Sequence, residues 1–395
     1  MRTLRQKGVH VSVGDGSSPP RIFRLSSDPN RPAPLRKLEG FISRDGSAPP
    51  EGFAWYVHLN NQGKIVSPAG SAAISLPESF DYLADGDVVR ASTDGEFDAL
   101  FRKSEMHHSF LLTERCNHYC LMCSQPPRDV DDSWIVNDVL AAIPLLDRTT
   151  PGILFTGGEP TLLGNRLLDL IQCAQSFLPE TGLHILSNGR AFKDNDFSAR
   201  CAAIGHHDLM FGIPIYSDQS DRHDYIVQAN GAFDETIRGI LNLKRNGLRV
   251  EVRVVIHKQS FERLPQLAQF IARNLTFVDQ VVFMGLEMTG FTRANLDSLW
   301  IDPVQYQREL VQAVQLLSDS RIFTAVYNHQ LCITDRSIWG YAQKSISDWK
   351  NEYMPECDGC EAKDICGGFF SSAKLKYSAS IRPISGLRDK PPPLS

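Results

Sequence analysis

Apolar and polar positions follow a repeating order between about residues 107 and 318. A short apolar run, a loop and an amphipathic stretch succeed one another six times, which is the pattern of parallel βα units. Strands are expected at residues 110–113, 153–156, 184–187, 209–215, 250–256 and 281–284. Helices are expected between them, for example at 162–177, 232–245 and 264–274. The pattern predicts an α/β domain built on a parallel sheet.

The flanking regions have different patterns. Residues 1–105 lack helical periodicity and contain turn-forming stretches at 14–20 and 27–32, with short strand-like runs at 9–13, 53–57 and 87–90 between them. They predict a β-rich N-terminal domain that either packs on the rest of the chain or recognises substrate. Residues 106–318 form the α/β domain, residues 319–380 a small cysteine-bearing domain, and residues 381–395 a turn-rich, basic and flexible tail.

Composition favours an intracellular enzyme. The 395 residues are 42% hydrophobic and 22% charged, which is enough for two or three domains with large cores. We expect no membrane span and no signal peptide, and hence a cytoplasmic protein. The net charge of -5 argues against broad nucleic-acid binding. Nine cysteines at metal-ligand spacings indicate a reducing compartment rather than a disulfide scaffold.

Three cysteines in one short segment carry the strongest chemical signal. Cys116, Cys120 and Cys123 have the spacing C-x3-C-x2-C. By themselves they could bind zinc with a fourth ligand or be buried thiols. The chain continues with Phe-Thr-Gly-Gly-Glu-Pro at 155–160 and Leu-Ser-Asn-Gly at 186–189. Each of these two motifs follows a predicted strand, where glycine permits close approach to the backbone.

Together the three motifs resemble the radical S-adenosylmethionine (SAM) superfamily. The resemblance implies an incomplete, TIM-like (β/α)6 barrel whose motifs share one mouth. It implies that the three cysteines bind three irons of a [4Fe-4S] cluster and that SAM chelates the fourth. Gly157, Gly158 and Glu159 would then lie at the SAM ammonium, and Ser187 and Asn188 at the ribose hydroxyls. The electron-transfer chemistry belongs to the cofactors, and the protein positions them and excludes water.

Further polar residues occupy the expected mouth of the barrel. By the same resemblance Ser217 and Arg253 would contact the SAM carboxylate and ribose, and an inward-facing arginine needs a partner. His223, Asp224 and Glu287 are weaker candidates for positioning substrate or carrying a proton; solvated loop residues are the alternative reading.

A second cysteine group lies near the C-terminus. Cys357, Cys360 and Cys366 resemble part of the auxiliary-cluster domains of peptide-modifying radical SAM enzymes. The longer form of that domain has a further cysteine where this chain has Phe370, which argues against two auxiliary clusters. Cys332 can complete a set of four for one auxiliary [4Fe-4S] cluster that moves electrons. A structural zinc site is the alternative.

The whole pattern is similar to the His-Xaa-Ser system radical SAM maturase family, as the shorter partner of a maturase pair. This resemblance implies modification of a ribosomally made precursor peptide, a second radical SAM maturase, and a one-electron reductant of the flavodoxin or ferredoxin type. Cross-linking, epimerisation and oxidation of the peptide all stay open.

Two rival functions accompany this hypothesis. One is a radical SAM dehydrogenase or rearrangement enzyme acting on a small metabolite. The other is a non-catalytic Fe-S scaffold or electron carrier, against which Glu159, Ser187 and Asn188 argue because a carrier has no need of SAM contacts. The sequence leaves the modified residue, the oligomeric state and the target of the N-terminal domain undefined.

Overall fold

A computed structural model describes residues 4–14, 19–44, 48–59, 67–344 and 352–387. The chain divides into two compact units. The first comprises Met1–Phe110, Ser133–Leu154 and Asp169–Gly182, and the second comprises Leu111–Asp132, Phe155–Leu168 and Leu183–Ser395. The first unit therefore contains the N-terminal sheet and also parts of two crossovers that the sequence pattern places in the α/β domain. The four-part division made from sequence stays a prediction.

The N-terminal sheet has eight strands in the order β1-β8-β7-β3-β4-β5-β6-β2. Strands β3 to β6 pair in parallel, whereas β1, β2, β7 and β8 pair antiparallel with their neighbours. The strand bounds are β1 Arg5–Gln6, β2 His10–Ser12, β3 Ile22–Ser26, β4 Glu39–Ser43, β5 Trp55–Leu59, β6 Ala72–Leu76, β7 Val88–Ala91 and β8 Phe97–Phe101. One short helix, α1 (Ala33–Arg36), lies between β3 and β4. The predicted strand-like runs at 9–13, 53–57 and 87–90 overlap β2, β5 and β7.

One face of this sheet buries an apolar core. Phe23, Trp55, Phe80 and Phe97 are at most 1% exposed and belong to one cluster. The rings of Phe23 and Trp55 stack with centroids 5.6 Å apart. Aromatic packing of this kind contributes about 0.5–1.5 kcal/mol per pair beyond area burial.

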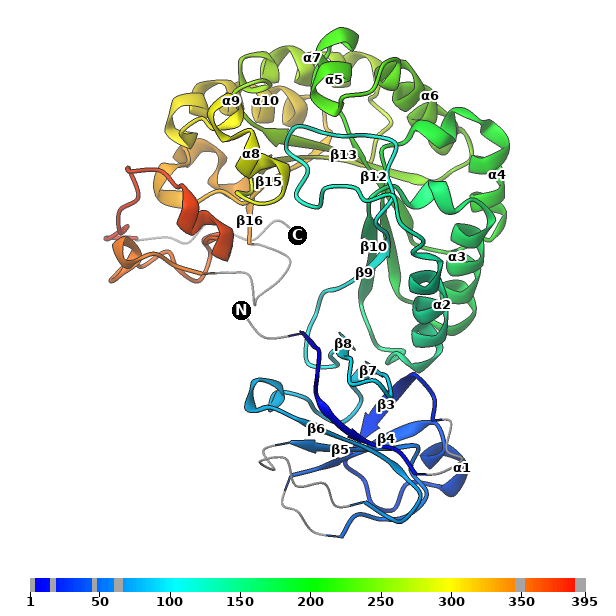
Figure 1. The fold of residues 1–395 in the computed structure, drawn as a ribbon. Helices are drawn as coiled ribbons and strands as arrows, with labels where there is room; N and C mark the ends of the chain where they lie inside the picture. The colour runs from blue at the N-terminus through cyan, green and yellow to red at the C-terminus, as the bar shows by residue number, and fades with distance from the viewer. Residues whose placement is uncertain (1–3, 15–18, 45–47, 60–66, 345–351, 388–395) are drawn as a thin grey trace. The chain divides into compact units, whose positions relative to one another are not determined.

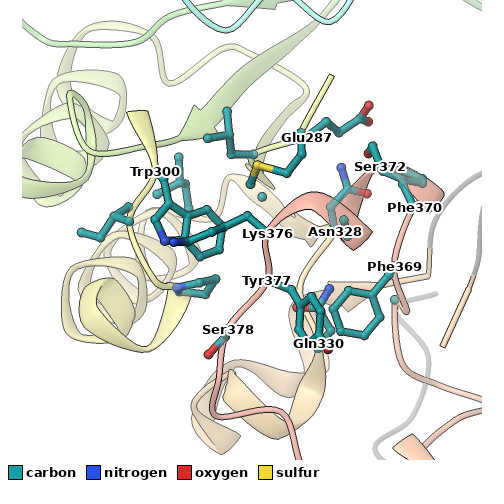
Figure 2. Close-up of a pocket in the computed structure, with 18 of the residues that line it drawn as sticks. Glu287, Trp300, Asn328, Gln330, Phe369, Phe370, Ser372, Lys376, Tyr377 and Ser378 are labelled. Atoms are coloured by element: carbon teal, nitrogen blue, oxygen red, sulfur yellow. The ribbon is translucent and has the colours of Figure 1, made fainter. Parts of the chain in front are cut away.

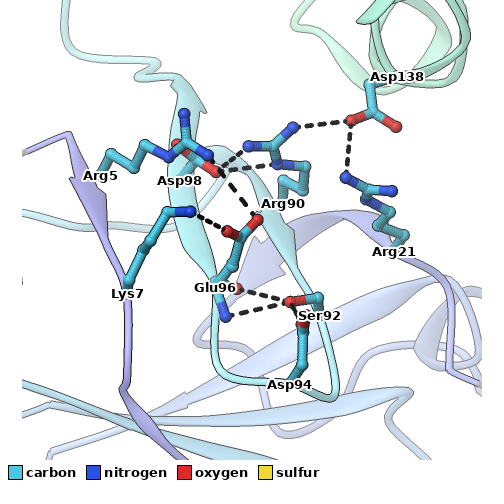
Figure 3. Close-up of polar contacts among 9 residues, drawn as sticks. All are labelled: Arg5, Lys7, Arg21, Arg90, Ser92, Asp94, Glu96, Asp98 and Asp138. Carbon is cyan, nitrogen blue, oxygen red and sulfur yellow. Dashed lines mark hydrogen bonds and ion pairs between the residues drawn. The ribbon is translucent and has the colours of Figure 1, made fainter. Parts of the chain in front are cut away.

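A buried ion cluster centres on Arg90 of β7 (Figure 3). Its guanidinium is 6% exposed; Nε donates to Asp98 Oδ2 at 2.9 Å and Nη1 to Asp138 Oδ2 at 3.0 Å. Asp138 lies on helix α2 (Ser133–Ala142), and Trp134 of the same helix lies 4.7 Å below the guanidinium. These contacts explain why α2 belongs to the first unit.

Replacing Arg90 by methionine is expected to destabilise the first unit by about 1–3 kcal/mol, because Asp98 and Asp138 lose their nearest, buried hydrogen-bond donor. They keep only the more exposed Arg5 at 3.4 Å and Arg21 at 3.6 Å. The measurement is urea denaturation of the Arg90→Met variant. The matched control is Lys103→Met, which breaks the more exposed pair between Lys103 and Asp147 at 2.8 Å and is expected to cost less than about 1 kcal/mol. Equal losses in the two variants would contradict the assigned role of the cluster.

The second sheet is a half-barrel with strand order β16-β15-β14-β13-β12-β11-β10-β9. Each consecutive pair of strands from β11 to β16 is parallel. The strands are β9 His108–Thr113, β10 Gly152–Gly157, β11 Gly182–Leu186, β12 Leu209–Pro214, β13 Arg249–Ile256, β14 Gln280–Gly285, β15 Phe323–Tyr327 and β16 Ala342–Gln343. The predicted α/β class and the six predicted strands are therefore observed. Two strands, β15 and β16, extend the sheet beyond the predicted six because residues 323–327 continue its parallel pairing.

Helices α4, α6, α7 and α10 follow the outer side of this curved sheet (Figure 1). The helices after α2 are α3 Asn165–Phe177, α4 Asn195–Ala203, α5 Ser220–Val227, α6 Ala232–Arg245, α7 Leu264–Asn274, α8 Phe291–Ala294, α9 Leu296–Leu299 and α10 Gln307–Asp319. The bounds of α6 and α7 are those predicted, because strongly amphipathic stretches define their own ends. No helix among the described residues has the length and apolarity that a membrane span needs.

The segment after β15 has little regular structure. It contains the short 3-10 turns η7 (Leu331–Ile333), η8 (Arg336–Tyr341), η10 (Pro355–Cys357) and η11 (Ser371–Leu375). A small core of Ile333, Met354, Cys357, Phe369 and Ile381 holds it together. Residues 381–387, which the sequence assigns to the tail, contribute Ile381 to this core, while residues 388–395 lie outside the described residues.

Candidate functional site

The loop after β9 carries Cys116, Cys120 and Cys123, and its base is closed by a buried carboxylate. Asp132 Oδ2 accepts hydrogen bonds from Thr113 Oγ1 at 2.7 Å and from the Glu114 amide at 2.6 Å. Each thiol is half-buried. A loop closed at its base loses less conformational freedom when it organises a ligand set.

The apex of the same loop is held by two distant segments. The Leu121 amide donates to the Ile226 carbonyl at 2.9 Å, at the end of α5. Asn295 Nδ2 donates to the Leu121 carbonyl at 2.9 Å, and Thr292 Oγ1 to the Met122 carbonyl at 3.2 Å. Met122 is 7% exposed and packs in an apolar cluster. Sequence reasoning missed Asn295 and Thr292, because no local motif marks residues that cap a loop 170 positions away.

The two glycines at the end of β10, Gly157 and Gly158, are required by the cysteine loop itself. A Cβ on Gly157, whose φ is 138°, would lie 2.4 Å from the Thr113 carbonyl oxygen. A Cβ on Gly158 would lie 2.1 Å from the Arg115 carbonyl oxygen. The Glu159 amide donates to that same Arg115 oxygen at 2.8 Å. The glycines thus admit the backbone that precedes Cys116, whereas their contact with SAM stays a prediction.

Glu159 joins the ends of two strands. Its side chain is buried, and Oε1 accepts from Thr161 Oγ1 at 2.6 Å, the Thr161 amide at 2.9 Å and Ser187 Oγ at 2.8 Å. Oε2 accepts from the Asn188 amide at 2.6 Å. Burial raises the pKa of the Glu159 carboxyl, and these hydrogen bonds oppose the rise. The structure therefore brings Glu159, Ser187 and Asn188 together as one hydrogen-bonded group.

A further link ties this group to the cysteine loop. Asn188 Nδ2 donates to Asn117 Oδ1 at 2.6 Å, directly after Cys116. Arg190 Nη1 donates to the Asn117 carbonyl at 3.4 Å, and Arg190 Nε donates to Glu235 Oε2 at 2.6 Å. The three sequence motifs thus converge through side-chain contacts, and Asn117 is a residue of the site that spacing alone did not identify.

The thiols of the loop lie in a desolvated, mutually interacting group. Burial raises the pKa of the Cys116 thiol to about 11 and also raises the pKa of the Cys120 and Cys123 thiols. Neighbouring cysteines and Glu159 raise the pKa of Cys116 and Cys120 further. Thiolates in such surroundings need a bound cation, as iron ligation provides. The donor set therefore fits a cluster with thiolate ligands.

No group of three or more His, Cys, Asp or Glu in the described part of the chain is arranged to hold a metal ion. Ligands of one zinc ion converge on a point about 2.3 Å from each sulfur. In a [4Fe-4S] cluster each thiolate binds a different iron, so the sulfurs need not converge.

Arg253 of β13 is half-buried and has protein partners. Its Nη1 contacts Glu251 Oε1, and its Nη2 lies 3.1 Å from Met284 Sδ. Tyr216, at the end of β12, interacts electrostatically with Arg253, Cys120 and Cys123. Through Tyr216, Arg253 is thus linked electrostatically to the cysteine loop. Its charge is balanced by Glu251, because a partly buried arginine without a partner would destabilise the fold. Ser217 is 1% exposed, and its Oγ accepts from the Gln219 amide at 3.1 Å.

The three weaker candidates have separate surroundings. His223 is buried, and its Nδ1 accepts from the Tyr216 amide at 3.2 Å. Asp224 caps the start of α6, since its carboxylate accepts from the amides of Gly231 at 2.5 Å and Phe233 at 2.8 Å. Glu287 lines a pocket beyond the end of β14. The structure does not bring these three together, and their catalytic roles stay predictions.

Buried neutral histidines predict acid sensitivity. Burial lowers the pKa of His223 and His329 to about 4 and that of His257 to about 3. A lowered pKa in the folded state means that the unfolded state binds more protons below its own value of 6.5. The stability that each neutral histidine contributes is therefore fully present well above pH 6.5 and is lost as the pH falls toward its folded-state pKa. At pH 5 each of these histidines is expected to cost about 2 kcal/mol.

The check is urea denaturation at pH 7 and pH 5. The His257→Asn variant, whose amide oxygen can still accept from the Gln259 amide as His257 Nδ1 does at 3.1 Å, should lose about 2 kcal/mol of the difference between the two pH values. His107→Asn, at an exposed histidine, serves as the control and should leave the difference unchanged. Equal stability of the wild type at both pH values would contradict the prediction.

The second cysteine group forms a site of its own. Cys332, Cys357, Cys360 and Cys366 line one cavity of about 290 Å³, measured to its open rim. The Ile384 amide donates to Cys360 Sγ at 3.3 Å. Burial raises the pKa of Cys332, Cys357 and Cys366. The structure thus places Cys332 with the other three, and four sulfur donors around a cavity fit a cluster with complete thiolate ligation.

Comparison with known families identifies the domain. Residues 110–271 match the model of the radical SAM superfamily. Over 183 residues the chain is 26% identical to the Fe-coproporphyrin III synthase of Methanosarcina barkeri, covering 45% of this chain and 43% of that protein. Over 159 residues it is 28% identical to the pre-heme d1 synthase of Dinoroseobacter shibae, covering 40% and 38%. The chain thus spans less than half the length of these curated relatives.

A solved structure was also compared. Streptococcus suis SuiB bound to S-adenosylmethionine gives a TM-score of 0.46 at 15% identity, covering 69% of this chain and 57% of SuiB. A score at this level supports no conclusion about function. Residues 110–271 thus match the radical SAM superfamily, and this match implies SAM and a [4Fe-4S] cluster. The more specific resemblance to the His-Xaa-Ser maturases is not confirmed by these comparisons.

Proposed function

We propose that this chain, whose residues 110–271 match the radical SAM superfamily, is a radical SAM enzyme that modifies a ribosomally synthesised peptide. The observation that carries the enzymatic part is the convergence of Cys116, Glu159 and Asn188 from three loops at one edge of the parallel sheet. Catalytic groups of parallel barrels lie at this edge. A scaffold or electron carrier needs only the cysteine loop and has no need of the loops that carry Glu159 and Asn188.

The residues of this chain have distinct roles in the proposal. Cys116, Cys120 and Cys123 would hold the cluster, which when bound supplies the electron that cleaves SAM to a 5′-deoxyadenosyl radical for hydrogen abstraction. Glu159 fixes the relative positions of the β10 and β11 loops through its hydrogen bonds to Ser187 and Asn188. Glu251 pairs with Arg253, which would preorganise the arginine for an anionic group of the cofactor.

The second site supports the peptide assignment. Cys332, Cys357, Cys360 and Cys366 would hold one auxiliary [4Fe-4S] cluster, which when bound accepts or delivers single electrons. A one-electron reductant of the flavodoxin or ferredoxin type, a precursor peptide and a second maturase are the proposed partners, in the cytoplasm. The resemblance of the cysteine pattern to peptide-modifying enzymes is what favours a peptide.

A small metabolite is the second candidate substrate. The two curated relatives are named for iron-coproporphyrin and pre-heme d1 synthesis, which favours a dehydrogenase or rearrangement enzyme acting on a tetrapyrrole. The two candidates share the SAM chemistry and differ in what enters the barrel.

The test is anaerobic reconstitution followed by analysis of iron, sulfide and 5′-deoxyadenosine with dithionite as reductant. We expect about eight irons per chain, from two four-iron clusters, and 5′-deoxyadenosine formation from SAM. A precursor peptide with His-Xaa-Ser repeats should increase 5′-deoxyadenosine formation, and the mass of that peptide should change. Coproporphyrin III should neither increase 5′-deoxyadenosine formation nor change in mass. About four irons together with zinc would overturn the auxiliary cluster, and no SAM cleavage would overturn the enzyme assignment in favour of the scaffold.

A further inference from the structure

A pocket opens beyond the carboxyl ends of β13, β14 and β15. It holds about 630 Å³ of empty space, measured to its open rim, and lies within the second unit. One wall comes from Ile256, the last residue of β13, and from residues 285–288, which begin at the last residue of β14. The opposite wall comes from residues within the segment 367–378, which follows the last cysteine of the second group. The carboxyl ends of parallel strands are the usual place for a ligand in barrels of this kind.

The pocket lies between the two cysteine sites. Leu286 lines it and also packs in the apolar cluster that contains Met122 and Cys120. On the opposite side, Gln330 lines both this pocket and the cavity of the four C-terminal cysteines. Leu286 therefore separates a molecule bound here from the first cysteine site, and Gln330 separates it from the second. This position suits a substrate that exchanges electrons with both sites.

The walls combine aromatic surface with one ammonium group, that of Lys376, and one carboxylate, that of Glu287. Figure 2 shows Lys376 extended toward Trp300, with Phe369 and Tyr377 beside each other below. Lys376 Nζ lies 5.8 Å from the centre of the Trp300 ring, and the rings of Phe369 and Tyr377 are 5.7 Å apart at 71°. Within the described ranges Lys376 makes no ion pair with a carboxylate, unlike Lys363, which pairs with Asp358 at 3.5 Å.

We propose that this pocket binds a carboxylate of the substrate peptide next to an apolar side chain, with Lys376 pairing with the carboxylate and Trp300 and Phe370 packing on the apolar group. The inference rests on the proposed function, since it names the substrate contacts of the same enzyme. The carboxylate can come from an aspartate side chain or from the peptide's C-terminus. Charge-assisted hydrogen bonds to lysine at the edge of an aromatic surface favour either source over a neutral amide.

The test is isothermal titration of the reconstituted full-length protein with three probes, in the absence of reductant. They are acetyl-Phe-Asp-amide, acetyl-Phe-Gly with a free C-terminus, and the neutral acetyl-Phe-Asn-amide. At least one acidic probe is expected to bind about three- to tenfold more tightly than the neutral one. The stronger of the two acidic probes identifies the source of the carboxylate. Lys376→Gln should abolish the difference, and Phe370→Ala should weaken all three probes.

Lys374→Gln is the matched control, because Lys374 lies two residues away, pairs with Glu352 at 2.8 Å and lines neither this pocket nor the cavity of the four cysteines. It should leave the preference for the acidic probes intact, and circular dichroism should show that all variants are folded. Equal binding of acidic and neutral probes, or an unchanged preference in Lys376→Gln, would overturn the inference. Because titration needs no SAM cleavage, lysine-dependent binding by a protein that does not cleave SAM would reject the proposed function and retain the pocket.

Discussion

Replacing Cys116, Cys120 and Cys123 together by alanine is expected to lower 5′-deoxyadenosine formation to the level of a mixture without enzyme. The reason is that thiolates are the ligands that iron–sulfur clusters require, and alanine supplies none. The iron content should fall by about four per chain. The measurement is chromatography of 5′-deoxyadenosine after anaerobic reconstitution with SAM and dithionite, alongside iron and sulfide analysis.

The matched control removes thiols elsewhere. Cys173 in α3 is half-buried and Cys201 in α4 is buried, and neither lines the two cysteine sites. The Cys173→Ala/Cys201→Ala variant should keep its iron and its activity. Full activity in the triple variant would show that the N-terminal cysteine loop is not the site of SAM cleavage, whatever the control does.

The second large effect is expected from Gly158→Ala. The added Cβ would meet the Arg115 carbonyl oxygen at 2.1 Å and Cys116 Cβ at 3.2 Å. Since both atoms belong to the start of the cysteine loop, the loop must move, at a cost of about 3 kcal/mol or more. We expect the variant to lose most of the iron of the first site and at least about 100-fold in SAM cleavage.

Gly340→Ala provides the comparison, because a Cβ there meets no atom within 4 Å and the backbone needs no positive φ. It should retain iron content and activity. Iron analysis of Gly158→Ala at both sites separates local from global effects, since Cys332, Cys357, Cys360 and Cys366 should keep their iron. Normal activity of Gly158→Ala would mean that the loop is not held as tightly as its backbone contacts indicate.

Periodicity predicted the elements best where burial is one-sided. Residues 232–245 and 264–274 form α6 and α7 with the predicted ends, and the six predicted strands are present. The sequence pattern did not show that β15 belongs to the parallel sheet. This strand has only five residues, and nothing in their sequence indicates that they pair with β14. The pattern also could not show that β3 to β6 pair in parallel, since short strands carry no signal for their partners.

Some residues of the candidate site were predicted from the sequence, and others were identified only from the folded structure. Spacing identified Cys116, Glu159 and Asn188 one by one, because each belongs to a contiguous motif. The contacts of Asn117 with Asn188, and of Asn295 with Leu121, join residues 71 and 174 positions apart. No local pattern encodes such a pair, so only the folded chain identifies Asn117 and Asn295 as parts of the site.

The sequence by itself determined the α/β class and the order of the three motifs along the chain, because these depend on local periodicity and spacing. It also predicted the thiol ligands, from the spacing of the cysteines. The tertiary structure decided what the motifs do for one another. It showed that the glycines at 157 and 158 make room for the cysteine loop, that Cys332 lines the cavity of the other three C-terminal cysteines, and that Arg253 is balanced by Glu251. It also placed a pocket with Lys376 at its rim between the two cysteine sites. These features depend on contacts between segments far apart in the chain, whose free energy arises only when the fold brings them together.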